Sequence, residues 1–156
     1  MNGIKIRGTG RCVPEKTVTN DDLAKIVETS DEWITSRTGI QRRRHCVTET
    51  HTSLCVNAAR AALEKAGVTP DQIGGCIVAT VTADNAVPSA ACMLQKELGL
   101  PTDIPCFDLN AACTGYKRLF SCACKAFSYT HLPAVFWILR HNYSVQTSDS
   151  GMVDYW

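Results

Sequence analysis

The sequence predicts an α/β fold in which a largely parallel, mixed sheet is covered by helices. Strand-like and helix-like stretches follow one another in the order β-α-α-β-α-β-α, which favours right-handed crossovers between parallel strands. Residues 76–81 are almost all apolar and β-branched, as in a strand buried on both faces. Residues 52–66 form an alanine-rich helical pattern that Gly67 ends. Without internal repeats or low-complexity linkers, the 156 residues are expected to form one domain.

The first elements are short. Residues 4–10 alternate apolar and polar side chains before two glycines, which predicts a strand ending in a turn. Residues 19–22 (Thr-Asn-Asp-Asp) supply capping oxygens and early acidic charge for a helix. We expect the apolar face of that helix at Leu23, Ile26 and Val27.

A second helix is predicted from Ser30 as N-cap to Gly39, and it carries Trp33 and Arg37 four residues apart. Side chains at this spacing lie on one face, so an indole and a guanidinium could clamp a ligand with an aromatic ring and a phosphate. Alternatively, Trp33 packs in the core and Arg37 pairs with a carboxylate. The spacing alone favours this alternative.

The boundaries of the later elements are marked by the same kinds of residue. Residues 42–44 (Arg-Arg-Arg) are interpreted as a solvated turn after the second helix. Residues 88–99 predict a helix that Pro88 and Ser89 open and Gly99 closes. Residues 105–109 predict the next strand, and a helix-compatible segment follows it.

Cys113 lies at the predicted corner between this strand and the following helix. Unpaired N–H groups and the helix dipole stabilise a thiolate there, which is the geometry of a nucleophilic cysteine. Alternatively, Cys113 is one of nine small apolar fillers, since free cysteine is often buried.

Composition excludes several classes of function. A net charge of +1 argues against a nucleic-acid partner or a membrane surface. No secretory signal or membrane-spanning run occurs, and nine scattered cysteines indicate reduced thiols, so we expect a cytoplasmic protein. Four side chains could in principle gather around a metal, but their mixed spacing makes that improbable, and no metal is expected. They are His45, Cys46, His51 and Cys55.

Several stretches together resemble one family, the β-ketoacyl-[acyl carrier protein] synthases III of bacterial fatty-acid synthesis. They cover roughly residues 3–116 in the family's order. They are Gly8-Thr9-Gly10 with Pro14, residues 19–23, residues 29–34 and 37–40, residues 79–80 with 88–92 and Gln95, and residues 108–116. The resemblance implies one half of the layered thiolase-like fold. Because other enzymes share that fold, the fold alone would not fix the reaction.

The resemblance implies a priming condensation. Cys113 would attack a short acyl-CoA to form a thioester, and malonyl-acyl carrier protein would lose CO₂ and condense with it. No cofactor is implied beyond acyl-CoA as substrate, and the complete family protein is expected to be a homodimer. The resemblance assigns Trp33 to the CoA adenine and Arg37 to the nucleotide end, with Thr29 nearby. Val87 matches a position that lines the partner's acyl pocket, where a small side chain would leave room for longer primers.

Beyond Tyr116 the resemblance fails. Residues 117–122 keep a helical rhythm and residues 134–139 a strand-like one, but the family's glycine turns are missing. We therefore interpret residues 1–116 as the thiolase-like N-terminal half and 117–156 as a divergent or frame-altered tail that completes the helix after Cys113. Neither His131 nor His141 matches the family's catalytic histidine, so the chain alone is expected not to condense. Alternatives are another thiolase-fold condensing enzyme, or a non-catalytic fragment that binds CoA or associates with intact subunits.

Overall fold

The structure is a computed structural model that describes residues 5–127 and 136–139. These residues divide into two compact units. The sheet unit holds residues 5–12, 50–127 and 136–139, and the two-helix unit holds residues 13–49. The predicted boundary at residue 116 stays a prediction, and a helix crosses it.

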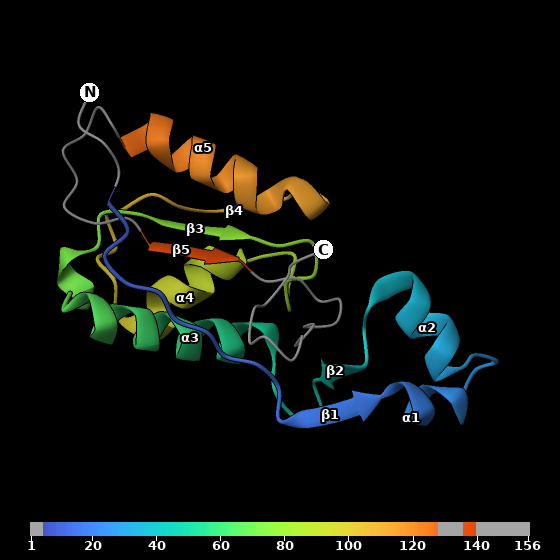
Figure 1. The fold of residues 1–156 in the computed structure, drawn as a ribbon. Helices are drawn as coiled ribbons and strands as arrows, with labels where there is room; N and C mark the ends of the chain where they lie inside the picture. Colours follow the sequence, from blue (N-terminus) through green and yellow to red (C-terminus); the bar gives the residue numbers. More distant parts are fainter. Residues whose placement is uncertain (1–4, 128–135, 140–156) are drawn as a thin grey trace. The chain divides into compact units, whose positions relative to one another are not determined.

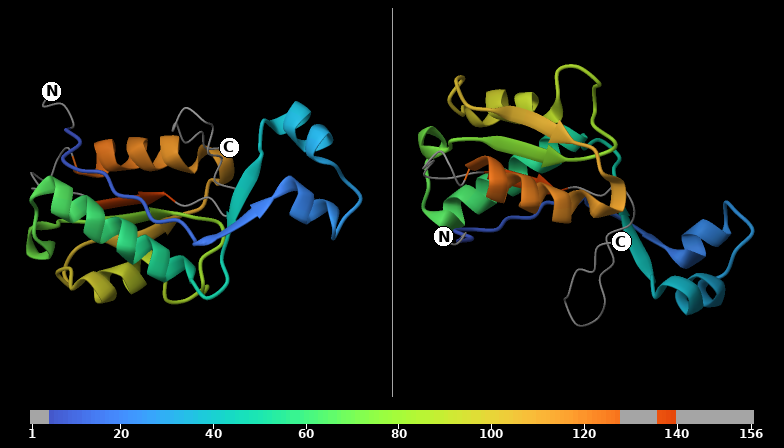
Figure 2. Two further views of the ribbon diagram at one scale, coloured as in Figure 1. Left: turned by 60° about the horizontal axis from the view of Figure 1, so that its bottom comes forward. Right: turned by 90° about the horizontal axis from the view of Figure 1, so that it is seen from above.

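The sheet unit has three parallel strands in the order β4 (Cys106–Leu109), β3 (Cys76–Ala79) and β5 (Phe136–Leu139). Helices α3 (His51–Ala66) and α4 (Ala90–Leu98) cover one face, and α5 (Gly115–Phe127) covers the other (Figures 1 and 2). Two 3₁₀ turns, η1 (Pro70–Gln72) and η2 (Ala112–Thr114), precede β3 and α5. The predicted helix-covered parallel sheet is confirmed.

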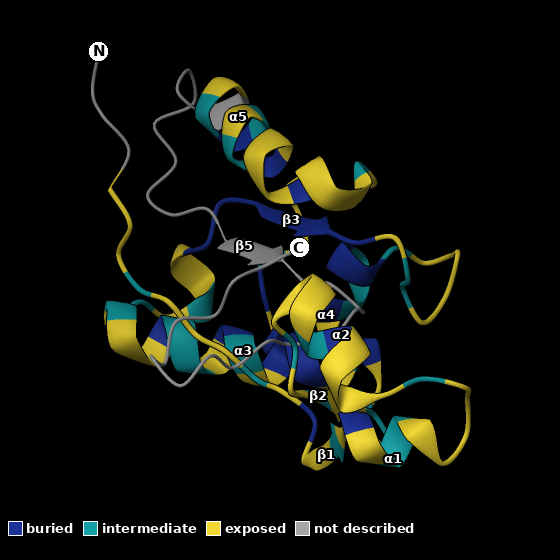
Figure 3. Cartoon of the chain, turned by 45° about the vertical axis from the view of Figure 1, so that its right-hand side comes forward, coloured by how far each residue is buried: buried dark blue, intermediate teal, exposed yellow. Residues whose placement is uncertain are grey.

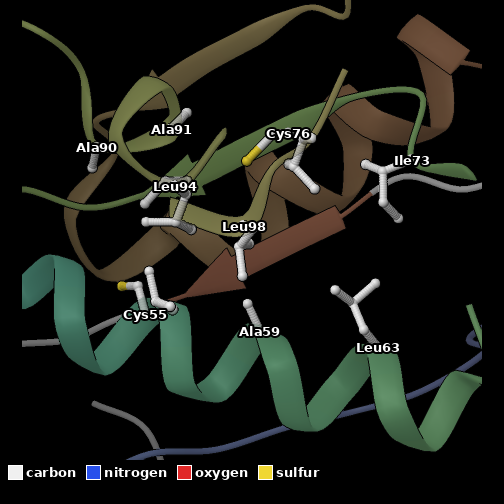
Figure 4. Close-up of a cluster of buried hydrophobic side chains, with 12 residues drawn as sticks. Cys55, Ala59, Leu63, Ile73, Cys76, Ala90, Ala91, Leu94 and Leu98 are labelled. Carbon is white, nitrogen blue, oxygen red and sulfur yellow. The ribbon is translucent and has the colours of Figure 1, made fainter. Parts of the chain in front are cut away.

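The central strand β3 explains why its sequence is continuously apolar. All four residues are buried, with Cys76 and Val78 in a cluster with α3 and α4 (Figure 4) and Ile77 and Ala79 in a second cluster with α5. Successive side chains of a strand point to opposite faces, so a strand between two helical layers has no solvent-facing position.

The helix ends of the sheet unit match the sequence signals. The Thr50 and Ser89 side chains accept hydrogen bonds from backbone N–H groups of the first turns of α3 and α4. Gly67 and Gly99 end the same helices with φ of 61° and 65°, a left-handed conformation that glycine adopts without a Cβ penalty.

The predicted first strand is wrong within the described residues, since residues 5–10 have no regular secondary structure. This segment runs along α3 instead (Figure 1). A Cβ on Gly8 would collide with the Ala62 carbonyl oxygen, and one on Gly10 with the Ala58 carbonyl oxygen. The two glycines therefore permit a close approach to a helix rather than a turn after a strand.

Gly10→Ala is expected to destabilise the fold by about 1–3 kcal/mol, because the added methyl group forces the backbone away from α3. Urea denaturation measures the change, and Thr9→Ala is the control, since Thr9 is its exposed neighbour. Equal stability of the two variants would contradict the close packing.

In the two-helix unit, β1 (Lys16–Thr19) pairs antiparallel with β2 (Arg42–His45), and α1 (Asn20–Ala24) and α2 (Asp31–Thr38) lie between them in sequence. Two expectations are corrected. Residues 42–44 form a strand rather than a solvated turn, because β1 supplies their backbone partners. The first helix ends at Ala24, so Ile26 and Val27 lie beyond it and are exposed rather than part of a buried face. No helix among the described residues is long and apolar enough to cross a membrane.

Candidate functional site

Cys113 lies in η2, between the end of β4 and the start of α5, at the predicted corner. All nine cysteines fall within residues 5–127, and Cys113 is the only exposed one. The remaining eight are buried or half-buried. The alternative that Cys113 is a buried apolar residue is therefore wrong.

The turn that holds Cys113 has a specific backbone shape. Ala112 has a φ of 43°, which is uncommon for a residue with a Cβ and costs conformational energy. The Thr114 hydroxyl donates to the Ala111 carbonyl at 2.8 Å, and the Thr114 N–H donates to the same oxygen at 3.0 Å. Arg118 Nε donates to the Thr114 hydroxyl at 3.3 Å. These bonds fix the turn on either side of the thiol.

Asp108, in β4 before the turn, directs its carboxylate to the start of α4. Its two carboxylate oxygens each accept a hydrogen bond of 2.8 Å, from the Ala90 and Ala91 N–H groups at the start of α4. A carboxylate at a helix N-terminus satisfies unpaired donors and is favoured by the helix dipole. Asp108 thus fastens the strand that leads to Cys113 to the helix behind it. The sequence signal for this role was an acidic residue in an otherwise apolar strand.

Val87 belongs to the loop between β3 and α4 and is 87% exposed. The loop is held on α3 by Asp84, whose carboxylate accepts from the His51 N–H at 2.8 Å and from the Thr52 N–H and hydroxyl at 2.7 Å. Partial burial of Asp84, the largest influence, raises its pKa. The Thr52 and His51 hydrogen bonds together outweigh it and hold the pKa below the usual value.

Asp84→Ala should cost about 1–2 kcal/mol of stability near neutral pH, because α3 loses acceptors at its N-terminus. The folded-state pKa of Asp84 is depressed, so its contribution is present above the unfolded-state pKa near 3.8 and declines as the pH falls through the lower folded value. Urea denaturation should therefore show a smaller difference between variant and parent at pH 3 than at pH 7. Asp103→Ala, at an exposed acidic residue, is the control. A difference that stays constant with pH would contradict this role.

Trp33 and Arg37 lie together on α2. The Arg37 guanidinium carbon is 4.6 Å from the centroid of the indole, and Trp33 is 54% exposed. Most of α2 is exposed, as Figure 3 shows. The alternative that Trp33 packs in the core is wrong, since the buried apolar residue of this helix is Ile34. Thr29, half-buried, lies directly before Ser30, the N-cap of α2.

The predicted site residues are divided between the two units. Cys113 and Val87 belong to the sheet unit, and Thr29, Trp33 and Arg37 belong to the two-helix unit. His131 and His141 lie outside the described residues. Among residues 5–127 and 136–139, no group of three or more His, Cys, Asp or Glu side chains could hold a metal ion.

The chain is similar in sequence to curated bacterial β-ketoacyl-[acyl-carrier-protein] synthases III. It is 51% identical to that of Clostridium acetobutylicum over 116 residues and 54% identical to that of Natranaerobius thermophilus over 118 residues. Each match covers 74% of this chain and 35% of the relative, so the chain spans about a third of the length of the curated relatives it matches. No protein-family model matches the sequence.

Solved structures show the same likeness. The 3-oxoacyl-[acyl-carrier-protein] synthase III of Aquifex aeolicus superposes with a TM-score of 0.82 at 40% identity, over 88% of this chain and 44% of that one. The priming β-ketosynthase of the R1128 polyketide pathway gives 0.80 at 34%, over 86% and 40%. The predicted thiolase-like fold and the predicted resemblance to the N-terminal part of these synthases are confirmed.

Proposed function

Since this chain resembles the N-terminal part of β-ketoacyl-[acyl-carrier-protein] synthases III, we propose that it carries the acyl-accepting part of such an acyltransferase, acting at the initiation of fatty-acid synthesis. One observation carries the proposal. Cys113 is the exposed cysteine of the nine, and it lies at a strand-to-helix turn in a chain with this resemblance.

In the first step, the Cys113 thiolate attacks the carbonyl carbon of a short acyl-CoA. A new sulfur–carbon bond forms, the bond to the CoA sulfur breaks, and CoA leaves as a thiolate that takes a proton from water. The Cys113 N–H is proposed as one donor to the oxyanion of the intermediate. In the second step, which we expect the complete enzyme but not this chain alone to carry out, malonyl-acyl carrier protein loses CO₂, and its enolate carbon displaces Cys113 from the thioester to give a 3-oxoacyl-carrier protein.

The nucleotide end of CoA is proposed to bind at α2. The exposed indole of Trp33 offers a flat face for the adenine, and the guanidinium of Arg37 offers charge-assisted hydrogen bonds to a phosphate, with Thr29 close in sequence. The proposal extends to a homodimeric cytoplasmic enzyme that uses acyl-CoA as substrate and requires no metal or further cofactor.

The test is transfer of the acyl group from radiolabelled acetyl-CoA to the purified chain, with release of CoA measured in parallel. The proposal expects a stoichiometric protein thioester that neutral hydroxylamine removes. CoA binding by calorimetry without any acyl transfer would overturn it in favour of a non-catalytic CoA-binding fragment.

Val87→Phe is expected to narrow the choice of primer. The exposed Val87 side chain is available to an acyl pocket, and replacing it by a larger ring would leave less volume for long or branched acyl groups. Competition between acetyl-CoA and a branched five-carbon acyl-CoA should shift by about 10-fold toward acetyl, since one or two methylene groups in a pocket are worth about 1–3 kcal/mol. Either of two results would contradict a role for Val87 in primer choice. One is a strict preference of the parent chain for acetyl-CoA, and the other is the same preference in Val87→Phe as in the parent.

A further inference from the structure

Asn20 is the most connected buried polar side chain of the two-helix unit. It is 1% exposed, and its amide nitrogen donates to Asp31 Oδ1 at 2.7 Å, to the Ile40 carbonyl at 2.7 Å and to the Thr35 hydroxyl at 3.3 Å. These partners lie at the start of α2, in its middle and just after its end. One side chain at the start of α1 therefore fixes α2 along its whole length.

The orientation of the Asn20 amide is itself fixed. Its oxygen accepts a hydrogen bond of 2.7 Å from Arg43 Nη2 in β2. Only this orientation presents the oxygen to the guanidinium donor and the nitrogen to three acceptors. Burial lowers the pKa of Arg43, and its Nη1 is buried with no hydrogen-bond partner among the described residues. The bond to Asn20 therefore gives the buried end of the Arg43 side chain a partner that its Nη1 lacks.

The α2 residues that hydrogen-bond to Asn20 lie on the face of the helix opposite Trp33 and Arg37. Asp31 and Thr35 are four residues apart and share one face, and a 3.3 Å hydrogen bond joins them. Trp33 and Arg37 each lie two residues further along, which is a rotation of about 200° around the helix. The hydrogen bonds of Asn20 on one side of α2 thus determine that Trp33 and Arg37 face solvent on the other.

We propose that Asn20 is a positioning residue for the Trp33–Arg37 pair and, through that pair, for the nucleotide end of CoA. The CoA part of this inference rests on the proposed function, whereas the orientation of α2 does not. Without Asn20, Asp31 and the Ile40 carbonyl each lose the shorter hydrogen bond that Asn20 donates, and Arg43 loses its acceptor on Asn20. We expect α2 then to shift about its buried Ile34, so that the indole and the guanidinium lose their fixed direction.

The variant is Asn20→Asp, which keeps the shape and the acceptor for Arg43 but removes the donor and sets a carboxylate against Asp31. Asn57→Asp is the matched control, since Asn57 is exposed on α3. The first readout is the indole N–H signal of Trp33 in a ¹⁵N spectrum, identified through Trp33→Phe. We expect Asn20→Asp to move this signal and Asn57→Asp to leave it in place. An unmoved signal would overturn the inference, whether or not the chain binds CoA.

The second readout is calorimetric affinity for CoA. Asn20→Asp should weaken binding about 10-fold and leave the rate of Cys113 alkylation by iodoacetamide unchanged. In a Trp33→Ala, Arg37→Gln background it should have no further effect, because its action passes through the pair. An equal loss in both backgrounds would overturn the positioning role.

Thr35→Val removes a single acceptor of Asn20 and should move the same indole signal by less, which tests the inference even if Asn20→Asp unfolds the unit. A parent chain that fails to bind CoA refutes the proposed function alone.

Discussion

Cys113→Ala should lower acyl transfer from acetyl-CoA to the chain by a factor on the order of 10³ or more, because the reaction needs a sulfur nucleophile at that position. Two other thiols of the sheet unit, those of Cys106 and Cys76, are expected to be poor substitutes. Cys106 is half-buried, and burial raises the pKa of its thiol, so little thiolate is present near neutral pH. Burial raises the pKa of Cys76 as well, far above its usual value.

Cys12→Ala is the matched control for this prediction. Cys12 is half-buried, and the change in side chain is the same. It should leave acyl transfer within about twofold of the parent, since it alters no residue of the turn. Thiol titration in the folded state gives an independent readout, with one fast-reacting thiol in the parent and in Cys12→Ala but none in Cys113→Ala. Residual acyl transfer in Cys113→Ala at the parent's rate would show that another group carries the acyl chain.

Trp33→Ala should weaken CoA binding by about 10- to 100-fold. Stacking of a base on an aromatic side chain is worth about 1–3 kcal/mol by alanine substitution, and the indole here is exposed and already stacked with Arg37. Arg37→Gln should weaken binding by a similar factor, because a charged hydrogen bond to phosphate contributes about 1.5–3 kcal/mol. Calorimetric titration with CoA measures both.

Salt separates the two contributions. Salt screens exposed charge pairs. Raising the salt concentration from about 0.05 to 0.5 M should therefore weaken CoA binding by the parent and by Trp33→Ala, whereas CoA binding by Arg37→Gln should depend less on salt. Ile26→Ala is the control, since Ile26 is an exposed apolar residue of the same unit, outside α2. If the Ile26 variant weakens CoA binding as much as Trp33→Ala does, the α2 pair is not the binding site.

Local sequence signals predicted the elements that depend on neighbouring residues. The caps Ser30 and Ser89 and the left-handed glycines Gly39 and Gly99 mark helix ends, because the hydrogen bonds involved span only a few residues. The spacing of Trp33 and Arg37 likewise placed both on one face. The buried position of Trp33 that the spacing favoured is wrong, because spacing shows which residues share a face but not whether other elements cover that face.

Contacts between distant residues were beyond these signals. Asp84 caps a helix that begins 33 residues earlier, and Asp108 caps one 18 residues earlier. Gly8 and Gly10 resembled a turn because glycine is common in turns, whereas their partners lie on α3, some fifty residues on. The sequence pattern predicts that Asn20 lies at a helix start, but its bonds to Ile40 and Arg43 depend on how the unit folds.

The most direct test is peptide mapping by mass spectrometry after the chain is incubated with acetyl-CoA and excess reagent is removed. The proposal predicts one acetyl group per chain, on the peptide that contains Cys113, and none on the peptides of the other eight cysteines. An unmodified Cys113 peptide, or acetyl groups spread evenly over the cysteines, would contradict the claim that this turn holds the acyl-accepting nucleophile.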